Sequence, residues 1–158
     1  MPTKSSPKPS LLNQTLNYLK YRSRSSQEIS RYLSQKTRDQ KAIDQTLQQL
    51  TDLNLINDAD FALQYIHSKI RQSYGPVVIR FQLKSRYGLD QTTIISALDQ
   101  VNFQDWLNAA LKYLQKIRSK LAAQASFHAR RAAYQHLYRR GFPQDIINAA
   151  IDEFNLTE

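Results

Sequence analysis

GLDQTTIISAL at residues 88–98 and GFPQDIINAAI at residues 141–151 follow one pattern, and this pattern decides the fold. Each stretch begins at a glycine, and an isoleucine, an alanine and an aliphatic residue follow six, nine and ten positions later. This spacing is typical of a helix that ends at glycine and is followed by an amphipathic helix. The same offsets from Thr37 reach Ile43 and Leu47. The three anchors lie 51 and 53 residues apart, which predicts three tandem units.

Glycine and proline are scarce, with only three and five among 158 residues. Average usage is about 7% for glycine and about 5% for proline. A β-sandwich or an open α/β sheet would need more turn residues, so we expect an all-α chain of nine helices, three in each unit. No two glycines lie within seven residues, which excludes a glycine-rich phosphate loop. Beyond residue 10, all of these residues are expected at helix junctions: Gly75, Pro76, Gly88, Gly141 and Pro143.

We expect a disordered basic tail over residues 1–10, which are rich in serine, proline and lysine. The three-helix repeats are expected at residues 11–56, 57–101 and 102–158. A unit of about 50 residues is marginal alone, so we expect the repeats to stack into an elongated, curved array. One compact globule of nine helices is the alternative.

Several helix ends carry local signals. Ser25 and Glu28 form a capping-box pattern, and Asn57 or Asp58 is expected to cap the next repeat. Gly75-Pro76 should end one helix and begin another, because proline suits the first turn. Gly88 is expected in the left-handed conformation that ends a helix, with Asp90 as the cap of the following one.

Composition argues against several function classes. The absence of cysteine excludes disulfides and cysteine-ligated zinc and suits a cytoplasmic protein. No stretch approaches the 18–20 apolar residues of a membrane span. His67, His128 and His136 have no matched cluster of acids, so we expect no catalysis, no metal site and no cofactor.

The net charge of +9 is unevenly distributed. Residues 1–27, 61–89 and 106–144 contain no aspartate or glutamate, whereas the expected third helix of each repeat holds most of the acids. A solvated helix usually mixes charges to gain favourable pairs. We therefore expect a basic stripe along the first two helices of each repeat, directed at a polyanionic partner. The alternative is that these bases only keep exposed faces soluble, and that the interleaved tyrosines pack rather than stack on bases.

Four stretches resemble the RecX family of bacterial modulators of the RecA recombinase. They are RSSQEISRYL at residues 24–33, LINDADFALQYI at 55–66, YGPVVIRFQLKSRYGL at 74–89 and LYRRGFPQDIINAAI at 137–151. The resemblance implies three tandem three-helix repeats and a non-enzymatic protein. No leftover apolar heptad demands a dimer, so we expect a monomer. The resemblance also implies binding to RecA and to its filament on single-stranded DNA, with inhibition of recombinase and coprotease activity, and leaves direct contact with nucleic acid open.

The candidate partner-binding residues are all basic. The resemblance and the charge pattern together indicate Arg71, Arg80, Lys84, Arg86, Arg130, Arg131, Arg139 and Arg140. In contrast, the segment from Asp58 to Phe61 is expected to be structural, with a cap followed by a core aromatic residue. Two other functions stay open: a nucleic-acid-binding module without a specific protein partner, and a scaffold for an unrelated acidic protein.

Overall fold

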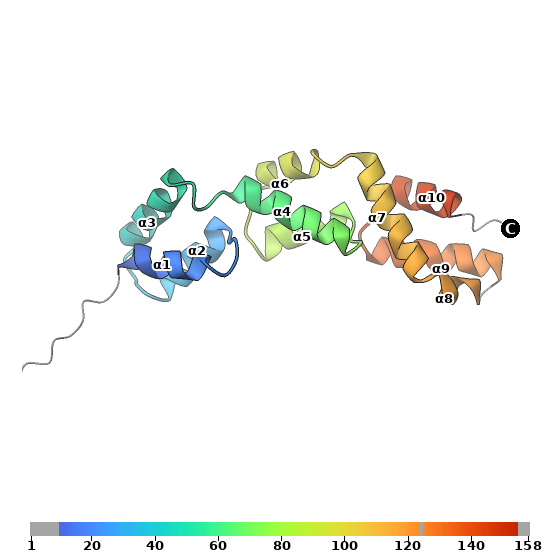
Figure 1. Cartoon of the computed structure of the whole chain (residues 1–158), viewed down its shortest axis with the longest axis horizontal. Coiled ribbons are helices and arrows are strands. Elements are labelled where there is room, and N and C mark those ends of the chain that lie inside the picture. The colour runs from blue at the N-terminus through green and yellow to red at the C-terminus, as the bar shows by residue number, and fades with distance from the viewer. Residues whose placement is uncertain (1–9, 124, 155–158) are drawn as a thin grey trace, which may run out of the picture. The chain divides into compact units, whose positions relative to one another are not determined.

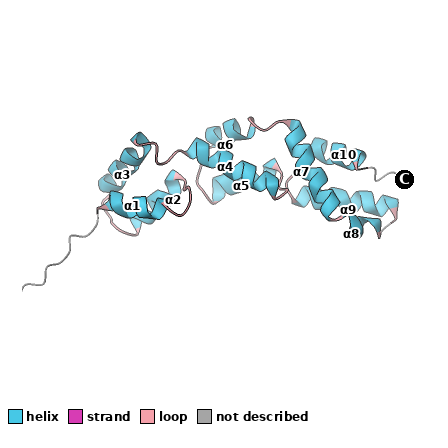
Figure 2. Ribbon diagram, in the orientation of Figure 1, coloured by secondary structure: helices cyan, strands magenta, loops and turns pink. Residues whose placement is uncertain are grey.

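A computed structural model describes residues 10–123 and 125–154 of the chain. These residues form ten α-helices and no strand, which confirms the all-α prediction (Figures 1 and 2). The helices belong to two compact units, Met1–Phe61 and Ala62–Glu158, and the boundary falls within the fourth helix. The predicted tail, residues 1–10, lies outside the described residues except for Ser10, which caps the first helix.

The first unit contains three helices and the start of a fourth. Their bounds are α1 Leu11–Leu19, α2 Ser26–Ser34, α3 Gln40–Asp52 and α4 Asp58–Arg71. The predicted capping box of α2 is confirmed, because the Ser25 side chain accepts from the Glu28 amide and the Glu28 side chain accepts from the Ser25 amide. The core of this unit consists of Ile29, Leu33, Ile43, Leu50 and Ile56, covered in part by leucines of α1.

The Asp58 carboxylate ties the start of α4 to the start of α2. It accepts one hydrogen bond from the Ser26 amide, with a nitrogen–oxygen distance of 2.8 Å, and another from the Ser26 hydroxyl. Asn57 is the cap of α4, since its side-chain oxygen accepts from the Ala59 and Asp60 amides. Phe61 is buried, as expected. Asp58 is therefore structural, but it acts as a long-range tie rather than as the cap.

The second unit contains the rest of α4 and six further helices. Their bounds are α5 Pro76–Ser85, α6 Gln91–Leu98, α7 Phe103–Lys116, α8 Arg118–Ala122, α9 Ser126–Arg139 and α10 Gln144–Glu153. Helix α7 packs against α9 and α10, which also contact each other, and α5 packs against α6. Phe142, Leu137, Leu114 and Ile147 are almost fully buried in this part of the core.

Most of the predicted helix junctions are confirmed. Helix α4 ends at Arg71 and α5 begins at Pro76, and Asp90 caps α6 by accepting from the Thr93 amide at 2.8 Å. Gly88 and Gly141 adopt left-handed φ angles of 67° and 84°. The first repeat differs, because Thr37 has no positive φ; its amide and that of Lys36 both donate to the Leu33 carbonyl. Helix α2 therefore ends without a left-handed residue.

The expectation of nine helices is wrong by one. Helix α8 follows α7 after a bend at Ile117, where φ is −101°, and neither glycine nor proline marks this break. Ile117 and Leu121 are buried, and α8 packs against α7 and α9. The bend therefore follows from the burial of these two apolar side chains, and the sequence has no turn residue at this position. The sequence also predicts Pro143 just inside the last helix, but Pro143 precedes α10 as its cap residue.

Candidate interaction site

The eight predicted contact residues lie on three helices of the second unit. Arg71 is at the end of α4, and Arg80 and Lys84 lie on α5, with Arg86 directly after it. Helix α9 contributes the remaining four: Arg130, Arg131, Arg139 and, directly after its last turn, Arg140. All are exposed except Arg140, which is half-buried. Of these eight, Arg71 and Arg140 line the same hollow, although they lie 69 residues apart in the chain.

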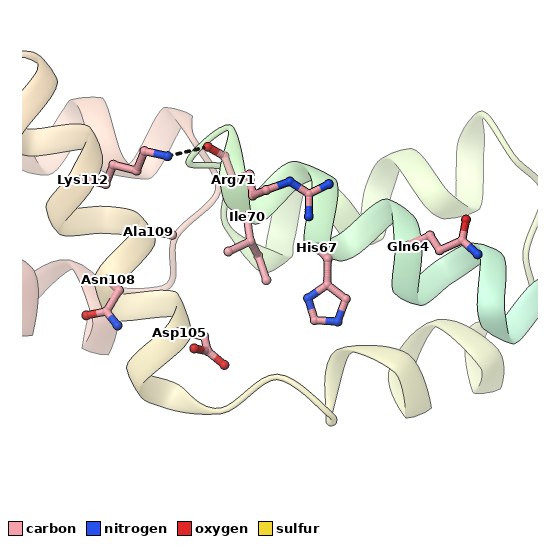
Figure 3. A pocket seen from close by; sticks show the side chains of 8 residues that line it. All are labelled: Gln64, His67, Ile70, Arg71, Asp105, Asn108, Ala109 and Lys112. Carbon is pink, nitrogen blue, oxygen red and sulfur yellow. Dashed lines mark hydrogen bonds between the residues drawn. The ribbon is translucent and has the colours of Figure 1, made fainter. Parts of the chain in front are cut away.

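We call this place the basic junction and define it as Arg71, Lys112, Lys116 and Arg140. A hollow of about 410 Å³ lies between these residues, and Gln72, Ser73, Tyr113 and Gln115 complete its lining. A larger hollow of about 860 Å³ shares Arg71 and Lys112 and extends between α4 and α7, where it is lined by His67 and Asp105 among others (Figure 3). Three long cationic side chains and one half-buried guanidinium therefore border the smaller hollow, and two of them also line the larger one.

The carboxyl end of α4 explains why two of these cations gather there. The last carbonyls of a helix lack intrahelical partners and carry the negative end of the helix dipole. The Lys112 ammonium donates to the Arg71 carbonyl at 3.0 Å (Figure 3), and the Arg140 guanidinium donates to the Gln72 carbonyl at 3.1 Å. Both cations thus serve the fold while part of each remains near the hollows.

Arg140 is held between two aromatic rings. Its guanidinium carbon lies 4.4 Å from the ring centroids of both Tyr74 and Tyr113, a distance typical of a cation–π contact. The Lys69 ammonium also lies near the Tyr74 ring, 5.2 Å from its centroid, and is 5.3 Å from the centroid of the Tyr65 ring. Tyr74 therefore packs between two cations, which favours the structural interpretation of this tyrosine over base stacking.

Two glycines allow the backbones to meet beside the junction. The Gly75 amide donates to the Arg140 carbonyl at 2.8 Å, and the Val77 amide donates to the Gly141 carbonyl at 3.0 Å. A Cβ atom on Gly75 would lie 2.3 Å from the Gly141 oxygen. The loop between α4 and α5 and the end of α9 are thus joined by direct backbone contact.

The other predicted residues have separate surroundings. The Arg86 guanidinium lies 5.5 Å from the Tyr87 ring centroid. Arg130 pairs with Asp152 of α10 at 2.6 Å, although both side chains are at least half exposed, so the pair adds little stability. This pair neutralises one charge of the expected stripe.

Lys112, Lys116 and Tyr113 are the residues that sequence reasoning left out of the site. Lys112 lies 41 residues from the carbonyl that it contacts. The acid-free stretch of residues 106–144 contains both lysines, but it contains many other bases too. Only the packing of α7 beside the end of α4 singles them out.

Arginine and lysine side chains around an open depression can bind carboxylate or phosphate groups. Within the described residues, no group of three or more histidine, cysteine, aspartate or glutamate side chains could hold a metal ion. Nor does any helix in the described part of the chain have the length and apolarity needed to cross a membrane. The lining of the smaller hollow is cationic, with Arg71, Lys112, Lys116 and Arg140 around it.

Comparison with known proteins identifies three consecutive domains. Residues 12–50, 57–98 and 104–151 match the family models for the first, second and third three-helix domains of RecX. Proteins named Regulatory protein RecX are similar to the chain: it is 35% identical over 139 residues to that of Bacillus licheniformis and 32% identical over 142 residues to that of Bacillus subtilis. These alignments cover 87% and 89% of the chain but 52% and 53% of those proteins, so the chain spans about half their length.

A solved structure shows the same fold. The crystal structure of RecX from Lactobacillus salivarius superposes with a TM-score of 0.86 at 27% identity, covering 93% of this chain and 96% of that one. The predicted tandem three-helix repeats are thereby confirmed. The boundaries of the repeats and their stacking into a curved array stay predictions.

Proposed function

This chain belongs to the RecX family of regulatory proteins, and we propose that it binds RecA and the RecA filament on single-stranded DNA in the cytoplasm. The proposed effect is inhibition of strand exchange and of coprotease activity, without catalysis by the chain itself. The observation that carries this proposal is the basic junction, where four cationic side chains from the matched second and third domains border one hollow.

The charge distribution supports an extended anionic partner. Helices α5, α8 and α9 contain no acidic residue, and Arg80, Lys84, Arg131 and Arg139 are exposed on α5 and α9. A recombinase filament repeats the same protomer surface along DNA, so tandem repeats can engage several protomers. Each weak contact then raises the effective concentration for the next one. Bridged protomers would be hindered in growth and in rearrangement during ATP hydrolysis.

The first experiment compares three probes in a pull-down: RecA alone, RecA filaments on single-stranded DNA and bare DNA. We expect retention of RecA filaments at about 150 mM salt, where contacts to bare phosphates are weakened. Added to filaments, the chain should lower ATP hydrolysis and strand exchange. Unchanged rates at saturating protein would refute the regulatory proposal. Binding to bare DNA with no preference for filaments would favour the nucleic-acid-binding module instead.

Two charge-reversal variants test whether Arg139 contacts the filament. Arg139→Glu changes an exposed residue beside the basic junction and should weaken filament binding. Lys41→Glu is the matched control, because Lys41 is exposed on α3, the acid-containing helix of the first repeat. Arg140 is unsuitable for this purpose, since its side chain also holds the fold.

A further inference from the structure

Helix α5 presents a mixed apolar and basic face. Val77, Arg80, Phe81 and Lys84 are separated by three and four positions, so they share one side of the helix. All four side chains are exposed, and Phe81 is 70% and Val77 59% accessible. We call these four residues the α5 face.

The opposite side of α5 is anchored in the core. Ile79 and Leu83 are fully buried. Gln82 accepts a 2.6 Å hydrogen bond from the Tyr65 hydroxyl, which orients α5 against α4. Burial, together with the neighbouring Tyr87 hydroxyl, raises the pKa of Tyr65 to about 12, so this donor keeps its proton at neutral pH. The contacts of Ile79, Leu83 and Gln82 therefore fix the rotation of α5 and keep the α5 face exposed.

The composition of the α5 face does not serve the stability of the helix. Arg80 and Lys84 are like charges four residues apart, an arrangement that slightly destabilises a helix. Among the described residues neither has a carboxylate partner in an ion pair. Phe81 leaves most of a large apolar ring in water, whereas Ile79 and Leu83 occupy the buried positions of the same helix.

We propose that the α5 face docks into an apolar recess bordered by carboxylates on a recombinase protomer, an inference that rests on the proposed function above. Phe81 is the central anchor, with Val77 one turn away beside it. Arg80 and Lys84 flank this anchor and pair with the acidic border. Buried aromatic anchors surrounded by polar contacts carry most of the binding energy in protein interfaces.

The chemistry of the α5 face favours a protein over a nucleic acid. Single-stranded nucleic acid binds through stacking of its bases on aromatic or planar groups. Val77 has no planar surface, and an aliphatic and an aromatic side chain together fit an apolar recess. Residues 61–89 contain no acid, so the charge complement must come from the partner.

The test measures the dissociation constant of the full chain for RecA filaments formed on oligo(dT), with bare oligo(dT) in parallel. Phe81→Ala should weaken filament binding about tenfold or more, as expected for loss of a central aromatic anchor. Lys84→Glu should weaken it too, and by a smaller factor in high salt because screening reduces the lost attraction. Phe103→Ala is the matched control, since Phe103 is half exposed near Asp105 and lies outside the α5 face. The helical circular dichroism and the fluorescence of the single tryptophan, Trp106, check the fold of each variant.

Equal weakening by Phe81→Ala and Phe103→Ala, or no weakening by either, would overturn the docking surface while leaving the proposed function intact. Failure of the unmodified chain to bind filaments would overturn both. A photo-crosslinking amino acid at position 81 separates the partners directly. Crosslinks to RecA are the expected result, and crosslinks to the oligonucleotide alone would overturn the assignment to a protein.

Discussion

Replacement of Gly75 by alanine tests whether backbone contact joins the second and third repeats. The φ angle of Gly75 is −89°, so alanine can adopt its conformation without strain. The difficulty is space. A Cβ atom would lie 2.3 Å from the Gly141 oxygen, 2.4 Å from the Gly141 carbonyl carbon and 2.4 Å from the Phe142 nitrogen. These are backbone atoms, so the segments must separate.

The expected loss of stability follows from this separation. Overpacking costs about 1–3 kcal/mol. Separation also weakens the hydrogen bonds from Gly75 to Arg140 and from Val77 to Gly141, each worth about 1 kcal/mol net. We therefore expect Gly75→Ala to lower the free energy of unfolding of the second unit by about 4 kcal/mol.

Urea unfolding followed by Trp106 fluorescence measures this loss. Trp106 is the only tryptophan, and it is buried on α7 in the second unit, so its signal reports that unit. With a denaturant slope of about 2 kcal/mol per molar urea, the midpoint should fall by about 2 M.

Gly88→Ala is the matched control. Gly88 is exposed and has a φ of 67°, so alanine there meets backbone strain of about 1–2 kcal/mol without the close approach to another segment. If Gly75→Ala is no more destabilising than Gly88→Ala, the backbone contact does not hold the two repeats together.

Two further predictions concern side chains. Arg140→Ala should destabilise the second unit by about 2–4 kcal/mol, because two cation–π contacts and a hydrogen bond from a charged donor are lost. Arg140→Lys should recover only part of this stability, since an ammonium lacks the flat face that stacks between two rings. Urea unfolding followed by Trp106 fluorescence measures both variants. For Glu28, partial burial acts to raise the pKa, but hydrogen bonds from Arg22 and the Ser25 amide and the charges of Arg22 and Arg24 outweigh it, so the pKa lies below its ordinary value of 4.5. The resulting stabilisation is present above pH 4.5 and is lost as the pH falls through the folded-state pKa, so thermal unfolding by circular dichroism should show a shallower acid decline for Glu28→Gln.

The predictions for Arg140 and for Glu28 can each be contradicted by one outcome. For Arg140, the control is Arg139→Ala, which should change the free energy of unfolding by less than about 0.5 kcal/mol because Arg139 is exposed. An equal effect at both arginines would show that the contacts of Arg140 with Tyr74 and Tyr113 do not stabilise the unit. A Glu28→Gln variant that declines with acid as steeply as the unmodified chain would show that this carboxylate is not stabilised by folding.

Local rules were sufficient for most of the helix ends. The capping box at Ser25, the break at Gly75-Pro76 and the left-handed Gly88 each depend on residues within a few positions along the chain. The bend at Ile117 has no such local signal. It depends on burial of Ile117 and Leu121 where α8 packs against α7 and α9, and no residue type marks it.

The candidate site was predicted in part. Charge segregation and the family resemblance together indicated the helices and eight basic residues, but they could not tell which bases lie together. Arg71 and Arg140 meet through residues that are far apart in sequence, and Lys112 enters between them from α7. The structure also gives Arg140 an intramolecular role that its exposed neighbour Arg139 does not share.

By itself, the sequence determined the all-helical fold, the threefold repeat and the concentration of positive charge on particular helices. These properties depend on short-range spacing, because helix periodicity, capping and glycine chemistry act within about one or two turns. Tertiary structure alone decided that Gly75 meets Gly141, that Arg140 lies between Tyr74 and Tyr113, and that Asp58 holds Ser26. Such contacts form only when distant segments bury their apolar faces together, since packing then brings unsatisfied backbone groups and cations within reach of one another.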